Sequence, residues 1–186
     1  GGVDDIDLNL DDFVQRVNSD LIGKVVNIAS RCAGFLRKKF DNQMGDTCAE
    51  PELVQSFIDA GEEIAALYEA REFNRAMREI IALADRANQY IDDKKPWVMA
   101  KDGSFEDEIQ AVCSVGINLF RVLATYLKPV LPAMAEKSEA FMQCSLDWTA
   151  LNAPLVAHEL APFEPLLQRV DTDVVAAMVE ASKSGA

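Results

Sequence analysis

The sequence predicts an all-α protein, a bundle of four long helices followed by shorter C-terminal helices. Apolar residues recur every three or four positions through most of the 186 residues, which is the spacing of amphipathic helices. The alternation of polar and apolar residues that indicates strands is nearly absent. Turn-forming residues separate the periodic segments, so we expect short connections and antiparallel or parallel packing of neighbouring helices.

The first helix is predicted from Asn9 to Phe40. Asn9 suits an N-cap, and the acidic side chains of Asp11 and Asp12 favour the positive end of the helix dipole. The sequence DNQMGD at residues 41–46 is rich in turn formers and ends the helix. The apolar stripe that would face the core consists of Phe13, Val17, Leu21, Val25, Ile28, Cys32 and Phe35.

Two more helices follow in the next fifty residues. Pro51 is well placed in a first helical turn, and residues 52–70 form the second predicted helix as one uninterrupted segment. The third helix covers residues 71–92, and its apolar face includes Met77. The sequence DDKKPW then ends this helix, because a proline in a helix interior lacks the N–H donor and clashes with the preceding turn.

The C-terminal half begins with the turn KDG. Ser104 and Asp107 approximate a capping box for a fourth helix that runs to about Lys128. Prolines at positions 129 and 132 end it, and a shorter fifth helix covers 131–144. Residues 145–170 contain three prolines and are predicted to be an ordered loop, after which Asp171 caps a last helix over 172–183.

The charge balance restricts the kind of partner that the protein can bind. The chain carries 18 Lys and Arg against 31 Asp and Glu, a net charge of −13. Proteins that bind the phosphate backbone of nucleic acids usually show a basic surface. A nucleic acid would therefore have to bind at a local patch, through its bases more than through its phosphates.

Neither catalytic residues nor a metal site are predicted. His158 is the only histidine, which argues against Ser-His-Asp or Cys-His catalysis and rules out a multi-histidine metal site. The inward Glu and Glu-x-x-His pairs of di-iron bundles are missing, as is a Gly-rich phosphate loop. The acidic pairs Asp92–Asp93 and Glu62–Glu63 are most simply solvated faces.

Cysteine usage and hydropathy favour a cytoplasmic protein that does not contact a membrane. No apolar run approaches the roughly 20 residues that span a bilayer, and the acidic N-terminus GGVDDIDLNL has no basic region of a signal peptide. The cysteines form no CxxC motif, so we expect them to be reduced, small buried hydrophobic residues. They are Cys32, Cys48, Cys113 and Cys144.

One face of the first helix carries polar side chains at helical spacing. These residues are Lys24, Asn27, Arg31, Gly34 and Lys38. An Asn amide offers a donor and an acceptor, and an Arg one turn away adds a planar fork of donors, so the pair can recognise the edge of an unpaired base. Glycine one turn further on allows close approach to the backbone. From spacing alone, a solvated helix face is the simpler interpretation.

The stretch KKPWVMAK at residues 94–101 has a similar double interpretation. A tryptophan is more often buried than exposed. Here Pro96 fixes the backbone before Trp97, and three lysines surround it: Lys94, Lys95 and Lys101. An aromatic side chain in a basic patch is suited to stacking on an unpaired base while the lysines contact phosphates.

Three separated segments resemble one family, the anticodon-binding domains of bacterial methionyl-tRNA synthetases. They are residues 5–35 (DIDLNLDDFVQRVNSDLIGKVVNIASRCAGF), 94–101 (KKPWVMAK) and 116–132 (GINLFRVLATYLKPVLP), in the order of the family. The resemblance covers nearly the whole chain. It implies a helical bundle, appended to a class I catalytic domain, that recognises the CAU anticodon of methionine tRNAs.

The resemblance also assigns roles to particular residues. The family motif Asn-x-x-x-Arg falls on Asn27 and Arg31, and its Pro-Trp falls on Pro96 and Trp97. By resemblance, Trp97 stacks on the first anticodon base, a cytosine, while Asn27 and Arg31 hydrogen-bond to anticodon bases and Pro96 sets the angle of the tryptophan. Contacts to the RNA backbone are our addition and do not come from the family: Lys24, Lys38, Lys94, Lys95 and Lys101.

The catalytic motifs of the family, His-Ile-Gly-His and Lys-Met-Ser-Lys-Ser, and its zinc-knuckle cysteines do not occur in these residues. The chain is thus expected to be a fragment without cofactor of its own, part of a ligase that attaches methionine to tRNA(Met) with ATP and Mg²⁺; zinc is a candidate only for the missing domain. We expect one domain over residues 1–186: a linker at 1–8, the bundle at 9–143, and a loop with a C-terminal helix at 144–186. Its expected partners are the anticodon loop and the missing catalytic domain, which would cover surface near 1–8 and 161–186.

Two alternatives stay open. A helical protein-interaction module has the same helical pattern without an RNA site. The anticodon-binding domain of another class I synthetase, for valine, isoleucine, leucine or cysteine, would have a related bundle with a different anticodon preference. Competition among anticodon stem-loops separates the three possibilities, because an interaction module would bind none of them.

Overall fold

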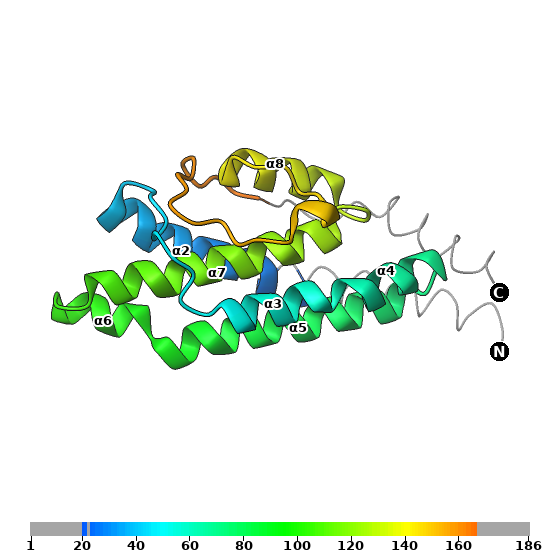
Figure 1. Ribbon diagram of the computed structural model, residues 1–186, viewed down its shortest axis with the longest axis horizontal. Helices are drawn as coiled ribbons and strands as arrows, with labels where there is room; N and C mark the ends of the chain where they lie inside the picture. The colour runs from blue at the N-terminus through cyan, green and yellow to red at the C-terminus, as the bar shows by residue number, and fades with distance from the viewer. Residues whose placement is uncertain (1–19, 22, 167–186) are drawn as a thin grey trace.

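The computed structural model describes residues 20–21 and 23–166 (Figure 1). In this part of the chain the regular structure is helical, apart from one isolated antiparallel bridge between Gln43 and Glu159. The all-α prediction is therefore confirmed. The helices are α2 (Gly23–Phe40), α3 (Pro51–Asp59), α4 (Gly61–Glu69), α5 (Phe73–Lys94), α6 (Pro96–Asp102), α7 (Glu106–Leu127) and α8 (Pro132–Met142), with a 3-10 turn at Trp148–Ala150.

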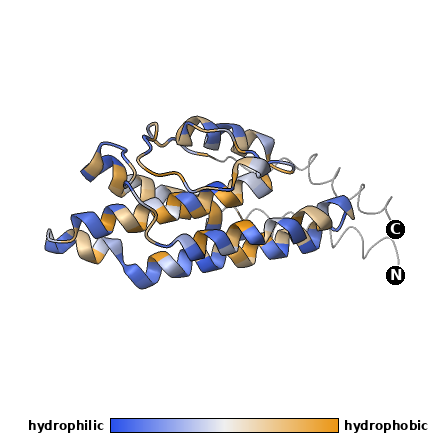
Figure 2. Cartoon of the chain, viewed as in Figure 1, coloured by the Kyte–Doolittle hydropathy of each residue, from blue (hydrophilic) through white to orange (hydrophobic). Residues whose placement is uncertain are grey.

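Helix α7 is the centre of the bundle. Every residue from Val112 to Leu127 is buried, and α2, α3, α5, α6 and α8 all pack against it. By length and apolarity it is also the one helix among the described residues that could cross a membrane, but 89% of its apolar window is covered by the other helices. Its hydropathy is that of a core helix, and Figure 2 shows the outer side of α5 as hydrophilic by contrast.

A buried polar stripe on α7 fixes the C-terminal loop. The Asn118 side chain donates to Leu155 O (3.0 Å) and accepts from Leu155 N (2.7 Å). The Arg121 guanidinium donates to Ala150 O (3.0 Å) and Ala153 O (2.7 Å). Because these bonds satisfy backbone groups of the loop, it can lie over α7 with little regular structure beyond the 3-10 turn at Trp148–Ala150. The predicted ordered loop is confirmed as far as residue 166.

The second predicted helix is wrong as a single segment, since it is divided into α3 and α4. The Tyr126 hydroxyl lies 2.6 Å from Phe57 O and 3.0 Å from Ile58 O, where the next turn of an unbroken helix would supply amide donors. The chain can approach the tyrosine this closely because residue 61 is glycine: a Cβ there would be 2.7 Å from the hydroxyl oxygen. A contact with α7 therefore decides the break.

One smaller prediction, the capping box of the fourth helix, is also wrong. No side chain caps α7, whose N-cap residue is Phe105, and the Ser104 hydroxyl instead bonds the Asp102 carboxylate two residues before it. The sequence DDKKPW does end the third predicted helix, but only at Lys94, and the short helix α6 begins directly after it.

The helix ends that depend on local signals agree with the structure. The first helix ends at Phe40, and Pro51 opens α3 in its first turn. The predicted Asn9 cap, the start of the first helix, the linker at residues 1–8 and the last helix at 172–183 lie outside the described residues. The division of the domain at residues 143 and 144 stays a prediction.

Candidate functional site

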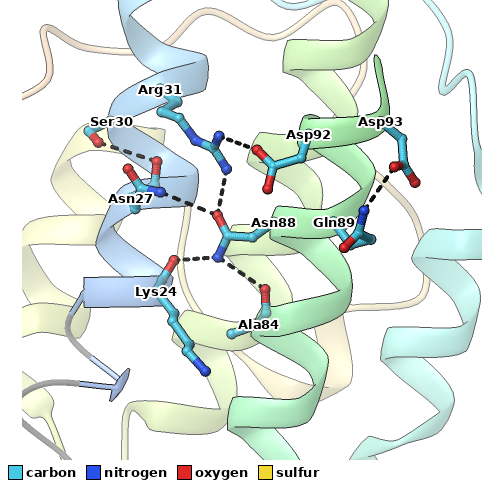
Figure 3. A network of polar contacts seen from close by, with 9 residues as sticks. All are labelled: Lys24, Asn27, Ser30, Arg31, Ala84, Asn88, Gln89, Asp92 and Asp93. Atoms are coloured by element: carbon cyan, nitrogen blue, oxygen red, sulfur yellow. Dashed lines mark hydrogen bonds and ion pairs between the residues drawn. The ribbon is translucent and has the colours of Figure 1, made fainter. Parts of the chain in front are cut away.

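Helices α2 and α5 run parallel and are joined by a row of polar contacts, which we call the polar ladder (Figure 3). Its residues on both helices follow the spacing i, i+3, i+7, and three side-chain contacts join positions 61 apart. The register of the two helices is therefore constant along the ladder. The contacts join Lys24 with Asp85 (2.7 Å), Asn27 with Asn88 (3.4 Å) and Arg31 with Asp92 (2.8 Å).

Asn88 is the residue of the ladder with the most hydrogen bonds. Its Nδ2 donates to two backbone carbonyls, Lys24 O (3.0 Å) on α2 and Ala84 O (3.1 Å) on α5. Its Oδ1 accepts from Arg31 Nη2 at 2.7 Å and from Asn27 Nδ2 at 3.4 Å. All the hydrogen-bonding capacity of a half-buried amide is thus used between the two helices.

Arg31 connects the ladder to the tryptophan of α6. Its two terminal nitrogens donate to Asp92 and Asn88, and its Cζ lies 5.8 Å from the centre of the Trp97 ring. This distance is within the range of cation–π contacts. Trp97 is 37% exposed, so the residue is partly open to solvent. The Arg31 Nε is buried without a hydrogen-bond partner among the described residues.

The link between α5 and α6 sets the place of Trp97. Lys95 adopts the left-handed conformation (φ 52°, ψ 60°), which is uncommon for a residue with a side chain, and its N–H bonds Ile91 O at 2.9 Å to close α5. Pro96 then occupies the first turn of α6 and is buried. Because proline fixes the backbone angle φ at this turn, it restricts the direction in which the Trp97 side chain projects from the start of α6.

Exposed basic side chains gather at the same end of the molecule. The C-terminal end of α2 and helix α6 lie toward one end of the bundle (Figure 1). None of the following side chains forms an ion pair with another described residue: Arg37, Lys38, Lys39, Lys94, Lys95 and Lys101. Lys94 lies over the ring of Tyr90 at 6.0 Å. Lys24, by contrast, is engaged by Asp85.

The structure therefore brings most of the residues singled out by the sequence to one surface. Asn27 and Trp97 are exposed and Arg31 lies between the ladder and the ring, while Pro96 is buried beneath. A Cβ added at Gly34 would meet no atom within 4 Å, so this stretch of α2 is open to approach. The roles of these residues in binding stay a prediction.

The α5 partners are not among the site residues that the sequence analysis predicts. The sequence predicts a solvated face for Asp92 and no role for Asp85 or Asn88. A signal does exist, because the α5 residues repeat the i, i+3, i+7 spacing of the α2 residues. The basic run Arg37–Lys39 in the last turn of α2 was likewise overlooked, although its composition is visible in the sequence.

Groups that could support other chemistry are held in place by the fold. His158 Nε2 lies 2.5 Å from Met142 O. All four cysteines are free, Cys32 and Cys113 are buried, and a hydrogen bond with Cys32 together with burial raises the pKa of the Cys113 thiol. Across the described part of the chain, no group of three or more His, Cys, Asp or Glu side chains could hold a metal ion.

The same fold occurs in solved synthetases. The apo form of Mycobacterium tuberculosis methionyl-tRNA synthetase aligns with a TM-score of 0.73 and 22% identity over 85% of this chain and 34% of that one. The same enzyme in complex with methionyl-adenylate aligns with a TM-score of 0.72 and 22% identity over 84% of this chain and 33% of that one. The chain thus spans about a third of the length of these synthetases.

A family model gives the more specific match. The model described as the anticodon binding domain of methionyl tRNA ligase matches residues 42–173, well over half of the chain. The matched region contains α3 to α8, including Trp97 and the α5 side of the polar ladder. The chain belongs to the family of anticodon-binding domains of methionyl-tRNA ligase.

Proposed function

We propose that the protein recognises the CAU anticodon of methionine tRNA, as the tRNA-binding part of a ligase that joins methionine to tRNA with ATP. The observation that carries the proposal is the contact of Arg31 with a partly exposed Trp97, beside the exposed amide of Asn27. An open aromatic ring next to fixed polar groups is what recognition of an unpaired base requires.

Each residue has a separate task in this proposal. The open part of the Trp97 ring stacks on the first anticodon base, the cytosine, and Pro96 holds the ring at its angle. Asn27 and Arg31 form hydrogen bonds with base edges. Arg31 donates through both terminal nitrogens within the protein, yet each of these nitrogens carries a second N–H that is available to a base.

The distribution of charge agrees with binding at one end only. The net charge is −13, and at this end the exposed lysines lie among exposed acidic residues such as Asp93, Asp102 and Glu106, so an RNA backbone would be held by individual lysines. Lys38, Lys94, Lys95 and Lys101 are exposed and lack ion-pair partners among the described residues, so they can contact phosphates without first breaking an ion pair. Lys24 would have to leave Asp85, and it is the weakest candidate of the set.

Activity, cofactors and location belong to the whole ligase in this proposal. ATP and Mg²⁺ would act in its catalytic domain, with which this domain would share an interface, and the enzyme would work in the cytoplasm. We assign no cofactor to this domain itself.

Binding of short RNA hairpins tests the proposal. We expect the 186-residue chain to bind a hairpin with CAU in its loop at least about tenfold more tightly than hairpins with valine, isoleucine, leucine or cysteine anticodons, since each well-made base contact discriminates by about 1–3 kcal/mol. Titration followed by fluorescence anisotropy gives the dissociation constants. Binding to none of the hairpins would favour a protein-interaction module, and preference for another anticodon would favour a related class I synthetase.

A further inference from the structure

We propose that Asn88 is a positioning residue of the anticodon site: it fixes which edge of the Asn27 amide faces the RNA. The inference rests on the proposed function, because it concerns how that site selects bases. The inference goes beyond the proposed function because it places part of the selectivity for bases in a residue on α5, which does not itself contact the bases.

The first step is that the Asn88 amide has a single favourable orientation. Its nitrogen faces two backbone carbonyls, Lys24 O and Ala84 O, which can only accept hydrogen bonds. Its oxygen faces Arg31 Nη2, which can only donate. A flipped amide would bring oxygen against two carbonyl oxygens and nitrogen against the guanidinium, losing three hydrogen bonds of 2.7 to 3.1 Å at once.

The second step is that this orientation passes to Asn27. With the Asn88 Oδ1 fixed as an acceptor, the side of the Asn27 amide that faces α5 must be its nitrogen, as Figure 3 shows. At 3.4 Å the contact is long, so it selects an orientation more than it adds stability. The Asn27 oxygen is then turned away from α5, and because the residue is exposed this oxygen is presented to an incoming base.

The third step concerns the bases that such an oxygen can accept from. Cytosine and adenine carry an exocyclic amine on the edge where uracil and guanine carry a carbonyl oxygen. A fixed acceptor favours the amines and rejects the carbonyls. If the Asn27 amide could turn, it would present its nitrogen to the carbonyl bases equally well, and the discrimination would be lost.

The test compares the change in base preference across variants. In the UAU and CGU hairpins, a carbonyl replaces the exocyclic amine that CAU carries at the first or second anticodon position, and the neighbouring ring nitrogen changes from an acceptor to a donor. We expect the unaltered chain to prefer CAU over one or both of the others, and Asn88→Ala to reduce that ratio by about tenfold, the factor that one net hydrogen bond gives. Anisotropy titration at a single salt concentration measures the ratio.

Two further variants separate positioning from a structural role. Asn88→Asp keeps the oxygen that faces Asn27 and Arg31 but loses the donor that ties Lys24 O and Ala84 O, so stability and overall affinity should fall while the CAU preference is retained. Gln89→Ala is the matched control, because Gln89 bonds Asp93 on the same helix at 2.8 Å and touches none of the ladder residues in Figure 3. It should leave affinity and preference unchanged.

The outcomes are distinguishable. Equal preference in the unaltered chain and in Asn88→Ala overturns the inference alone, as does loss of preference in Asn88→Asp to the same extent as in Asn88→Ala. Absence of any CAU preference in the unaltered chain overturns the proposed function and the inference together. Should Asn88→Ala not fold, as judged by circular dichroism, Asn88→Ser carries the test, because a hydroxyl cannot form all four bonds of the amide.

Discussion

The two tryptophans occupy opposite kinds of site. Trp148 is half-buried, with its ring 4.8 Å from the ring of Tyr126 and 6.4 Å from that of Tyr68, where burial raises the pKa of both tyrosines. Trp97 is more exposed and its charged neighbour is Arg31. Since the same residue type serves packing at one position and an open surface at the other, the pair provides an internal comparison.

Trp97→Ala should separate binding from stability. We expect the free energy of unfolding to change by less than about 1 kcal/mol, because the ring is partly exposed, while hairpin binding weakens by about 1–3 kcal/mol through lost stacking. Trp97→Phe should restore part of the binding, since it keeps an aromatic face. Urea denaturation and hairpin titration measure the two quantities.

Trp148→Ala is the control. We expect it to lower the free energy of unfolding by about 2–4 kcal/mol, because the ring contacts are lost, and to leave hairpin binding per folded molecule unchanged. If Trp97→Ala instead caused the larger loss of stability and left binding intact, Trp97 would be a core residue and the proposed stacking surface would be wrong.

Among the helices, the break between α3 and α4 shows how one element can be shaped by another. Its helix-forming residues alone favour continuity, and the division follows from the position of the Tyr126 hydroxyl over the carbonyls of Phe57 and Ile58. The Tyr68 hydroxyl on α4 donates to the backbone carbonyl of Tyr126 on α7 at 2.6 Å. Thus α7 donates to α3 through Tyr126, and α4 donates to α7 through Tyr68. The two tyrosines hold the divided helix against the core.

Gly61→Ala should destabilise the protein although alanine is the better helix former. The added Cβ would lie 2.7 Å from the Tyr126 hydroxyl oxygen, which forces a shift at a cost of about 1–3 kcal/mol. The cost should shrink by at least about 0.5 kcal/mol when Tyr126→Phe removes that oxygen, because the two changes share one contact. Denaturation of the four combinations measures the coupling.

Gly34→Ala is the matched control, since no atom lies within 4 Å of its added Cβ, and it should raise stability by about 0.5–1 kcal/mol. A Gly61→Ala variant as stable as the unaltered protein would mean that the tyrosine does not shape the break.

The helix ends show which elements a sequence can predict. Turn formers after Phe40 and the proline at position 51 act within one or two turns, and both predictions agree with the structure. The break at Gly61 depends on a side chain far along the chain, so no local pattern contains it. Helix α6 is not predicted either. Its start depends on the left-handed conformation of Lys95, which is uncommon for a residue with a side chain.

The site was predictable to the extent that it lies on one helix. The spacing on α2 places Asn27 and Arg31 on one polar face but leaves a solvated face as the simpler interpretation, and the exposed role of Trp97 is what the resemblance to the family implies. The partners Asn88 and Asp92 require the register between α2 and α5, which is a property of the packed bundle. Sequence spacing restricts the candidates on each helix but does not say which pairs meet.

For the molecule as a whole, a few exposed lysines on a chain with a net charge of −13 make the salt dependence of binding informative. If about three lysines contact phosphates, the logarithm of the binding constant should fall with the logarithm of salt concentration with a slope near −2, taking roughly −0.7 per phosphate of single-stranded RNA. Titrations of the CAU hairpin over a range of potassium chloride concentrations measure the slope. The Lys38→Ala and Lys95→Ala double variant should make it shallower, whereas Lys137→Ala, on α8, should not change it.

A slope several times steeper would contradict this expectation, because it would require a broad basic surface. The described basic residues outside the site end provide no such surface, since Lys128 and Arg75, for example, are paired with Glu139 and Glu72.

The constant separation along the polar ladder limits how sequences of this kind can evolve. A substitution at one position of α2 alters the environment of the residue 61 places later, and the parallel register repeats that dependence at each contact from Lys24 to Arg31. Insertions or deletions between the helices would change the separation of 61 residues but not the spacing of the ladder residues within each helix. Related chains should therefore exchange the ion pair of Lys24 and Asp85 together, so that a charge reversed on one helix is accompanied by a reversal on the other, whereas Asn27 and Arg31, which bind bases in the proposed function, should be retained.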